Sequence, residues 1–206
     1  CAALREQTDE QKQTVMAERA KTGDYGAAMK RLSQIEKSAS VLTRLLDLFP
    51  GTFGRYIALH FAPFLRDPIE TAQQRAAFDE IVAFLDGVRF DPPLDVQRFL
   101  EETALPCDVI RGMSDAMRRA VNEPERYFAE NRTAIEAYRA MCQSEEYQNS
   151  TAARVRAFLK TQTEENGYNE VFLPAMRRLS PSYRDYCARL KRADEVFQKE
   201  FPNEKT

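Results

Sequence analysis

Residues 29–51, MKRLSQIEKSASVLTRLLDLFPG, carry the clearest structural pattern in the chain. Their apolar side chains recur every three or four positions, which is the spacing of one face of an α-helix. Pro50-Gly51 follows the last of them and is expected to end the helix, because proline lacks the backbone donor that a helix requires. The stretch predicts a long amphipathic helix, whose core-facing stripe comprises Met29, Leu32, Ile35, Ala39, Leu42, Leu46 and Phe49.

The remainder of the chain has the same helical character. Only 7 of its 206 residues are glycine, and the strict apolar–polar alternation of a half-buried strand is missing. We therefore expect an all-α protein, an irregular multi-helix bundle of about eight or nine helices. Within it, Asp67-Pro68 is expected to start one helix, and Glu123-Pro124 is expected to start another that runs on to Cys142.

Breaks in the pattern suggest how the chain is divided. Residues 1–22 are polar and are typical of a solvated N-terminal helix or a tether. Asp91-Pro92-Pro93 is the strongest break, because adjacent prolines lack amide donors and favour extended geometry. It predicts an N-terminal helical lobe at residues 23–90 and a C-terminal helical lobe at residues 91–206, with one continuous domain as the alternative.

The charge balance limits the classes of partner. Lysine and arginine number 30, aspartate and glutamate number 32, and the net charge is −2. A protein that grips a nucleic-acid backbone needs a dominant positive field, so we expect no nucleic-acid partner. The longest apolar stretch, residues 56–65, is far shorter than the roughly 20 residues that span a bilayer. We therefore expect no membrane-spanning segment.

Residues suited to catalysis are sparse. His60 is the single histidine, so metal sites that need two histidines are excluded. It lies in an apolar run, where a partly buried structural histidine is expected. Cys107 lies outside known nucleophile motifs, and glycine-rich phosphate-binding loops are missing. We expect no catalytic residue, cofactor, metal or small-molecule substrate. A helical enzyme with an unrecognised carboxylate or thiol site is the alternative.

Basic residues gather in the C-terminal part of the chain. Such a cluster is suited to an anionic partner or a membrane surface. Ion pairing with nearby carboxylates along helix surfaces is the alternative interpretation. The members of this basic patch are Arg177, Arg178, Arg189, Lys191 and Arg192.

Two cysteines, Cys142 and Cys187, fall on the predicted apolar faces of their helices. They could meet in the core, where a disulfide would contribute about 2–4 kcal/mol to stability. Burial as reduced thiols is the alternative, since free cysteine is itself a common core residue.

The first residues suggest how the protein is held in the cell. Cys1, followed by the small residues Ala2-Ala3, resembles the mature start of a bacterial lipoprotein. The resemblance implies a diacylglycerol on the Cys1 thiol and an N-linked acyl chain such as palmitate. It also implies a lipid-anchored protein on the periplasmic face of the outer membrane. An arbitrary start within a longer chain is the alternative, with a cytoplasmic or organellar location.

These observations lead to the hypothesis of a non-catalytic helical lipoprotein. It would act as a structural or assembly subunit of a cell-envelope complex, through contacts with protein partners. The alternative is a soluble helical adaptor or subunit of a larger intracellular or organellar complex.

Overall fold

The described part of the protein is built from helices. The computed structural model describes residues 2–49, 51–103 and 105–202, and over these ranges it contains twelve α-helices, one 3₁₀ turn and one π turn but no strand. The predicted all-α class is confirmed, whereas the expected eight or nine helices are too few. None of the helices over the same ranges combines the length and apolar composition needed to span a membrane.

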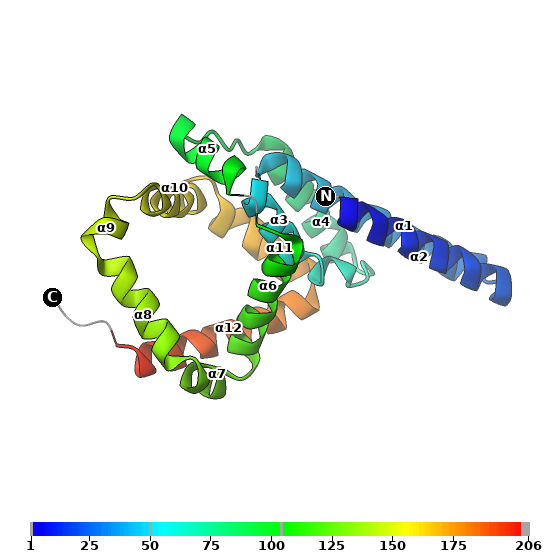
Figure 1. Cartoon of the computed structure of the whole chain (residues 1–206). Coiled ribbons are helices and arrows are strands. Elements are labelled where there is room, and N and C mark those ends of the chain that lie inside the picture. The colour runs from blue at the N-terminus through cyan, green and yellow to red at the C-terminus, as the bar shows by residue number, and fades with distance from the viewer. Residues whose placement is uncertain (1, 50, 104, 203–206) are drawn as a thin grey trace.

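The first two helices form a hairpin. α1 (Ala2–Thr22) and α2 (Tyr25–Leu48) pack along each other, and Figure 1 shows the pair projecting from the other helices. The turn between them contains Gly23, whose φ of 67° lies in the left-handed region that glycine adopts without strain. Asp24 then caps α2, because its carboxylate accepts a hydrogen bond from the Ala27 amide at 2.9 Å.

After α2 the chain continues through α3 (Gly51–Phe61), the 3₁₀ turn η1 (Phe64–Arg66) and α4 (Ala72–Gly87). The expectation that this last helix begins at Asp67-Pro68 is wrong. A capping box sets its start instead. The Thr71 hydroxyl accepts from the Gln74 amide at 3.1 Å, and the Gln74 side-chain oxygen accepts from the Thr71 amide at 3.0 Å.

Six helices then follow one another in an arc (Figure 1): α5 (Leu94–Glu102), α6 (Cys107–Asn122), α7 (Pro124–Glu130), α8 (Arg132–Gln143), α9 (Glu145–Gln148) and α10 (Thr151–Glu165). The segment that was expected to be one helix up to Cys142 is divided near Asn131 into α7 and α8. The Asn131 side-chain amide donates to the Tyr127 carbonyl at 2.8 Å, where α7 ends. The Ser144 hydroxyl accepts from the Tyr147 amide at 3.2 Å and caps α9.

The remaining elements lead the chain back through the centre. They are the π turn η2 (Tyr168–Phe172), α11 (Leu173–Leu179) and α12 (Pro181–Glu200). α11 packs against α4, and α12 packs against α6 and α7. The arc and the central helices are thereby joined into one ring-like arrangement, from which the α1–α2 hairpin projects (Figure 1).

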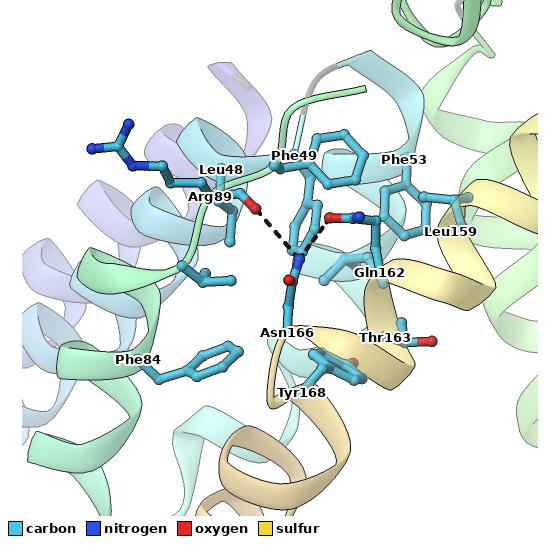
Figure 2. Close-up of a pocket in the computed structure, with 13 residues that line it drawn as sticks. Leu48, Phe49, Phe53, Phe84, Arg89, Leu159, Gln162, Thr163, Asn166 and Tyr168 are labelled. Carbon is cyan, nitrogen blue, oxygen red and sulfur yellow. Dashed lines mark hydrogen bonds between the residues drawn. The ribbon is translucent and has the colours of Figure 1, made fainter. Parts of the chain in front are cut away.

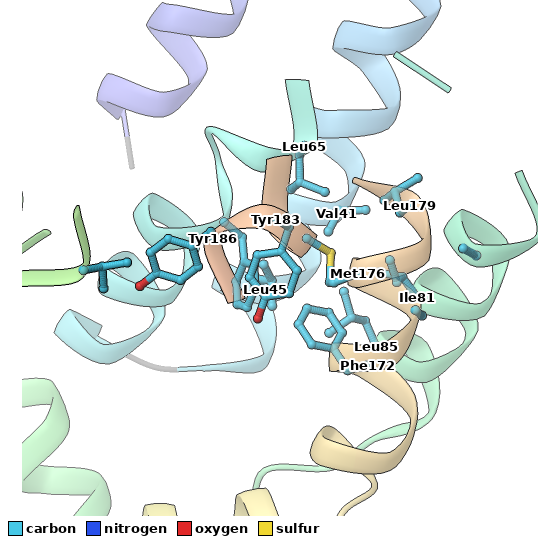
Figure 3. Close-up of a cluster of buried hydrophobic side chains, with 14 residues drawn as sticks. Val41, Leu45, Leu65, Ile81, Leu85, Phe172, Met176, Leu179, Tyr183 and Tyr186 are labelled. Carbon is cyan, nitrogen blue, oxygen red and sulfur yellow. The ribbon is translucent and has the colours of Figure 1, made fainter. Parts of the chain in front are cut away.

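The main hydrophobic core lies where α2, α3, α4, α11 and α12 meet. Figure 3 shows Met176 of α11 in the middle of this cluster. Leu45, Phe61, Ile81 and Phe172 contribute further side chains that are fully buried. Burial of one such side chain contributes roughly 1.5–3 kcal/mol. This cluster is therefore a major source of the stability of the fold.

The core is continuous across the predicted hinge. α4, from the predicted N-terminal lobe, packs on α11, from the predicted C-terminal lobe, and both contribute to the main core. A smaller cluster joins α5 to α10 through Val96, Leu100 and Val155, and Phe90 packs against it. The hydrophobic core is thus not divided at residues 91–93.

The turn at residues 65–69 is fixed to α2 by one glutamine. The Gln34 side-chain amide donates to the Leu65 carbonyl at 3.0 Å and to the Asp67 carbonyl at 2.9 Å. Its side-chain oxygen accepts from the Ile69 amide at 3.3 Å. The backbone groups of this irregular segment therefore find partners inside the protein.

The same turn is also joined to α12. The Asp67 carboxylate accepts from the Ser180 hydroxyl at 2.6 Å and from the Ser182 amide at 2.8 Å. Ser180 is fully buried, and its oxygen accepts from the Tyr183 amide at 3.0 Å. A carboxylate at this position also interacts favourably with the positive end of the α12 dipole.

The structure exposes more surface than a compact protein of its size. Its accessible area is 13140 Å², whereas a compact monomer of 23.7 kDa exposes about 9800 Å². The projecting hairpin and the ring-like arrangement of the arc account for the excess (Figure 1). Large apolar side chains form part of this surface, among them Tyr25, Met29, Leu94 and Tyr138.

Two glycines provide a matched test of the packing of α3 against α5. Gly51 has a φ of 62°, and a β-carbon there would overlap the Leu100 carbonyl oxygen, whereas a β-carbon at Gly112 in α6 would meet open space. We expect Gly51→Ala to lower the free energy of unfolding by about 2–4 kcal/mol, from backbone strain and overlap together. Gly112→Ala should raise it by about 0.5–1 kcal/mol. Urea unfolding followed by circular dichroism measures both, and a Gly51→Ala variant of unchanged stability would contradict this packing.

Candidate functional site

A broad groove lies beside the α1–α2 hairpin. It is bordered by residues 10–15 of α1, residues 29–42 of α2 and the segment 62–75, and its volume is about 1120 Å³. We call it the hairpin groove. α2 contributes half of its lining residues, from Met29 to Leu42, so the groove extends along this helix for several turns.

The walls of the hairpin groove are basic. Five cationic side chains border it against two carboxylates, Glu10 and Glu70, although the whole chain has a net charge of −2. Arg31 forms an ion pair with Glu18. The other four cations form no ion pair with another described residue: Lys30, Lys37, Arg66 and Arg75. Over the described residues, four of the cations that border the groove are therefore not paired with a carboxylate.

The floor of the hairpin groove is apolar and held in place. Ile35 and Leu42 of α2 and Ile69 of the turn are half-buried along it. Gln34 lies among them and fixes the turn to α2 through the hydrogen bonds described above. The groove thus has a preformed apolar surface beside its charged walls, and protein interfaces combine an apolar centre with a polar rim in the same way.

A second hollow is a small internal pocket between the end of α2, α3, α4 and α10 (Figure 2). Its volume is about 50 Å³, enough for a few water molecules or a small apolar group. Half-buried side chains line it, mainly Phe49, Phe53, Phe84, Leu159 and Tyr168.

Polar groups lie at the edge of this pocket. The Asn166 amide donates to the Gln162 side-chain oxygen at 2.6 Å and to the Arg89 carbonyl at 3.4 Å, and Figure 2 shows the Arg89 guanidinium pointing away. Burial raises the pKa of Tyr168 above its usual value, so its phenol is uncharged at neutral pH. The pocket offers an apolar space without an ionised side chain aimed into it.

His60 is enclosed by aromatic rings. The ring centroids of Phe61, Tyr186 and Phe64 lie 4.9, 5.5 and 5.8 Å from that of His60. Burial, and secondly the positive charge of Arg118, lowers the pKa of His60 below its usual value. His60 lines neither the hairpin groove nor the internal pocket. Its surroundings are those of the structural histidine expected from the sequence.

The two cysteines considered for a disulfide lie in different surroundings. The sulfur of Cys142 in α8 lies 3.7 Å from a guanidinium nitrogen of Arg156. Cys187 of α12 instead packs against the main core. Both are free thiols, so the predicted disulfide is not formed in this structure. Cys1, the predicted lipidation site, lies outside the described residues.

The predicted basic patch is partly neutralised by carboxylates. Arg178 pairs with Glu80 of α4, and Arg192 pairs with Glu125 of α7 at 2.9 Å. Ion pairing, the alternative interpretation of this patch, thus accounts for two of its five cations. The other three are exposed and form no ion pair with another described residue: Arg177, Arg189 and Lys191.

The hairpin groove does not follow from the sequence, because its cations come from separate segments. Lys30 and Lys37 belong to α2, whereas Arg66 and Arg75 belong to η1 and α4. One signal is present in the sequence: Lys30 and Lys37 are seven positions apart and share a helix face. The other two cations reach the groove only through the tertiary fold.

The lowered pKa of His60 predicts a pH-dependent contribution to stability. Because the folded protein binds this proton less readily than the unfolded chain, stability is lost as the pH falls below about 6.5. We expect the free energy of unfolding to fall more in the wild type than in His60→Gln between about pH 7.5 and 5.5. Urea unfolding at both pH values measures the difference. An equal fall in the two proteins would show that His60 is not the titrating group.

The described residues contain no group of three or more His, Cys, Asp or Glu side chains placed to hold a metal ion. Comparison with known proteins found no matching family model, no matching curated protein and no matching solved structure. The function is therefore inferred from the hairpin groove and from the charges around it.

Proposed function

We propose that the protein is a non-catalytic helical subunit that assembles with protein partners in the cell envelope. The observation that carries the proposal is the hairpin groove, which combines an apolar floor with unneutralised cations and stands open in the single chain. Protein interfaces have this composition, with an apolar centre and a polar rim. A partner that fills the groove would bury the floor and supply charges to its walls.

The rest of the surface supports a role in assembly. α8 buries none of its side chains completely, and its residues Tyr138 and Met141 are 57% and 45% exposed. α6 exposes Val109 and Met113 in the same way. Apolar side chains that gather on an exposed surface are typical of regions that contact another protein.

The proposal includes an anchor on Cys1. It is supported by Cys1-Ala2-Ala3, which resembles the start of a mature lipoprotein. Each buried methylene of an acyl chain contributes about 0.8 kcal/mol, so a diacylglycerol and a further acyl chain such as palmitate hold a domain without a spanning helix. The anchored protein would lie on the periplasmic face of the outer membrane.

A steric block tests whether the hairpin groove is used for assembly. Ser33 is exposed on α2 and lines the groove. We expect Ser33→Trp to fill the groove and release the chain from its complex, measured as a shift from a large native assembly to the 23.7 kDa monomer in gel filtration of a gentle detergent extract. Ser33→Ala is the control and should leave the assembly intact. An assembly of unchanged size in Ser33→Trp would contradict the proposal.

The anchor is tested by the intact mass of the chain from its native source. We expect a mass excess equal to a diacylglycerol and one acyl chain, and its loss in Cys1→Ser. An unmodified mass, or additional residues before Cys1, would disprove the anchor. A chain that is unmodified but still assembled through the groove would instead be the soluble adaptor of the alternative hypothesis.

A further inference from the structure

The internal pocket between α2, α3, α4 and α10 is separate from the hairpin groove, and the proposed function does not use it. It is bordered by the exposed residue Arg89 and otherwise by half-buried residues, so it lies close to the surface. Protein interiors are normally packed without such spaces. A small ligand that reaches the pocket would gain contacts that the chain itself does not make there.

The walls of the pocket favour an uncharged alkyl group. Phe49 and Phe84 contribute aromatic rings, and Val88 and Leu159 contribute aliphatic side chains. A charged group would lose its hydration in this space without gaining a partner of opposite charge, because the Arg89 guanidinium points away from it (Figure 2). The part of a ligand that enters the pocket is therefore apolar.

The volume of the pocket limits the size of that part. A protein cavity of about 150 Å³ accommodates benzene. In proportion, a pocket of about 50 Å³ accommodates about two or three carbon atoms, which is the end of an unbranched alkyl chain. A phenyl ring is too large for it.

One polar atom beside the pocket lacks a partner. The Asn166 side-chain nitrogen donates to the Gln162 side-chain oxygen at 2.6 Å and to the Arg89 carbonyl at 3.4 Å. A carbonyl can only accept, so the second bond fixes which end of the amide is the nitrogen. The Asn166 Oδ1 atom accepts no hydrogen bond from another described residue, and Figure 2 shows this amide among the lining side chains. An open acceptor favours a ligand that donates a hydrogen bond.

We infer that the internal pocket binds a short, unbranched primary alcohol. The alkyl chain of the alcohol fills the space between the apolar walls, and its hydroxyl donates to Asn166 Oδ1. A carboxylate cannot donate in this way, and the charge of an ammonium group is costly to bury. The site adds a small-molecule ligand to a protein whose proposed role is assembly.

Two probes with the same number of non-hydrogen atoms test the inference. 1-Propanol donates and accepts hydrogen bonds, whereas propionitrile only accepts them. Each is titrated into the ¹⁵N-labelled full chain while the backbone amide signals of the pocket residues are followed by NMR. We expect 1-propanol to bind with a Kd of about 1–10 mM, which is about three- to tenfold tighter than propionitrile. Propylammonium and benzyl alcohol should not bind, because of charge and size respectively.

Removal of the acceptor tests the hydrogen bond. Asn166→Ala should make the affinities for 1-propanol and propionitrile equal, because it removes Oδ1 but keeps the apolar walls. Asn169→Ala is the matched control. The Asn169 side chain donates to the Thr163 carbonyl at 3.0 Å and does not line the pocket, so this variant should keep the preference for 1-propanol.

Filling the pocket tests its location. Val88→Phe should abolish the binding of both probes, because the larger side chain occupies the space, and Thr163→Leu is a second variant with the same expected result. Val109→Phe adds the same group at a position that is 43% exposed and outside the pocket, so it should bind as the wild type does. Circular dichroism and urea unfolding verify that each variant is folded.

Three results would overturn the inference. The first is the absence of signal shifts at up to about 100 mM 1-propanol, which would leave the pocket to water alone. The second is equal affinity of the wild type for 1-propanol and propionitrile. The third is binding that folded Val88→Phe and Thr163→Leu leave unchanged, which would place the alcohol elsewhere. None of these results bears on the hairpin groove, which Ser33→Trp tests independently.

Discussion

The fold depends on the turn at residues 65–69, whose backbone groups must find hydrogen-bond partners inside the protein. A buried group left without a partner costs about 1–3 kcal/mol. Gln34 supplies partners from α2, and the Gln74 amide donates to the Pro68 carbonyl at 3.2 Å and to the Leu179 carbonyl at 3.0 Å. Asp67 then reaches the start of α12. Three helices distant in sequence are thereby held to one short segment, and the main core fills the space between them.

The same turn gives the hairpin groove its properties. Ile69 and Arg66 border the groove, and the hydrogen bonds of Gln34 fix the backbone that carries them. A surface that is rigid before binding loses less conformational entropy when a partner arrives. In the proposed function, the constraint that stabilises the core would therefore also prepare the surface that a partner binds.

Local patterns were sufficient for part of this structure. The apolar periodicity of residues 29–49 and the following Pro50-Gly51 predicted the long helix α2 and its end. The start assigned to Asp67-Pro68 was wrong although the sequence holds a local signal for the true one, the capping box of Thr71 and Gln74. What no local pattern reveals is that the Asp67 carboxylate caps a helix more than a hundred residues away. The hairpin groove was missed because its cations belong to α2, η1 and α4, which come together only in the tertiary fold.

The distribution of ion pairs explains why the groove remains positive in a chain of net charge −2. Carboxylates pair with arginines between helices elsewhere, as in Arg44–Asp86 at 2.6 Å and Arg154–Asp95 at 2.9 Å. Such exposed pairs contribute only about 0–1 kcal/mol each. Four cations of the groove pair with no carboxylate among the described residues, and the lack of such pairs therefore costs the fold little. Their summed field, however, attracts an oppositely charged partner before contact and repels others. In the proposed function, an arrangement that is almost neutral for stability would thus determine the choice of partner.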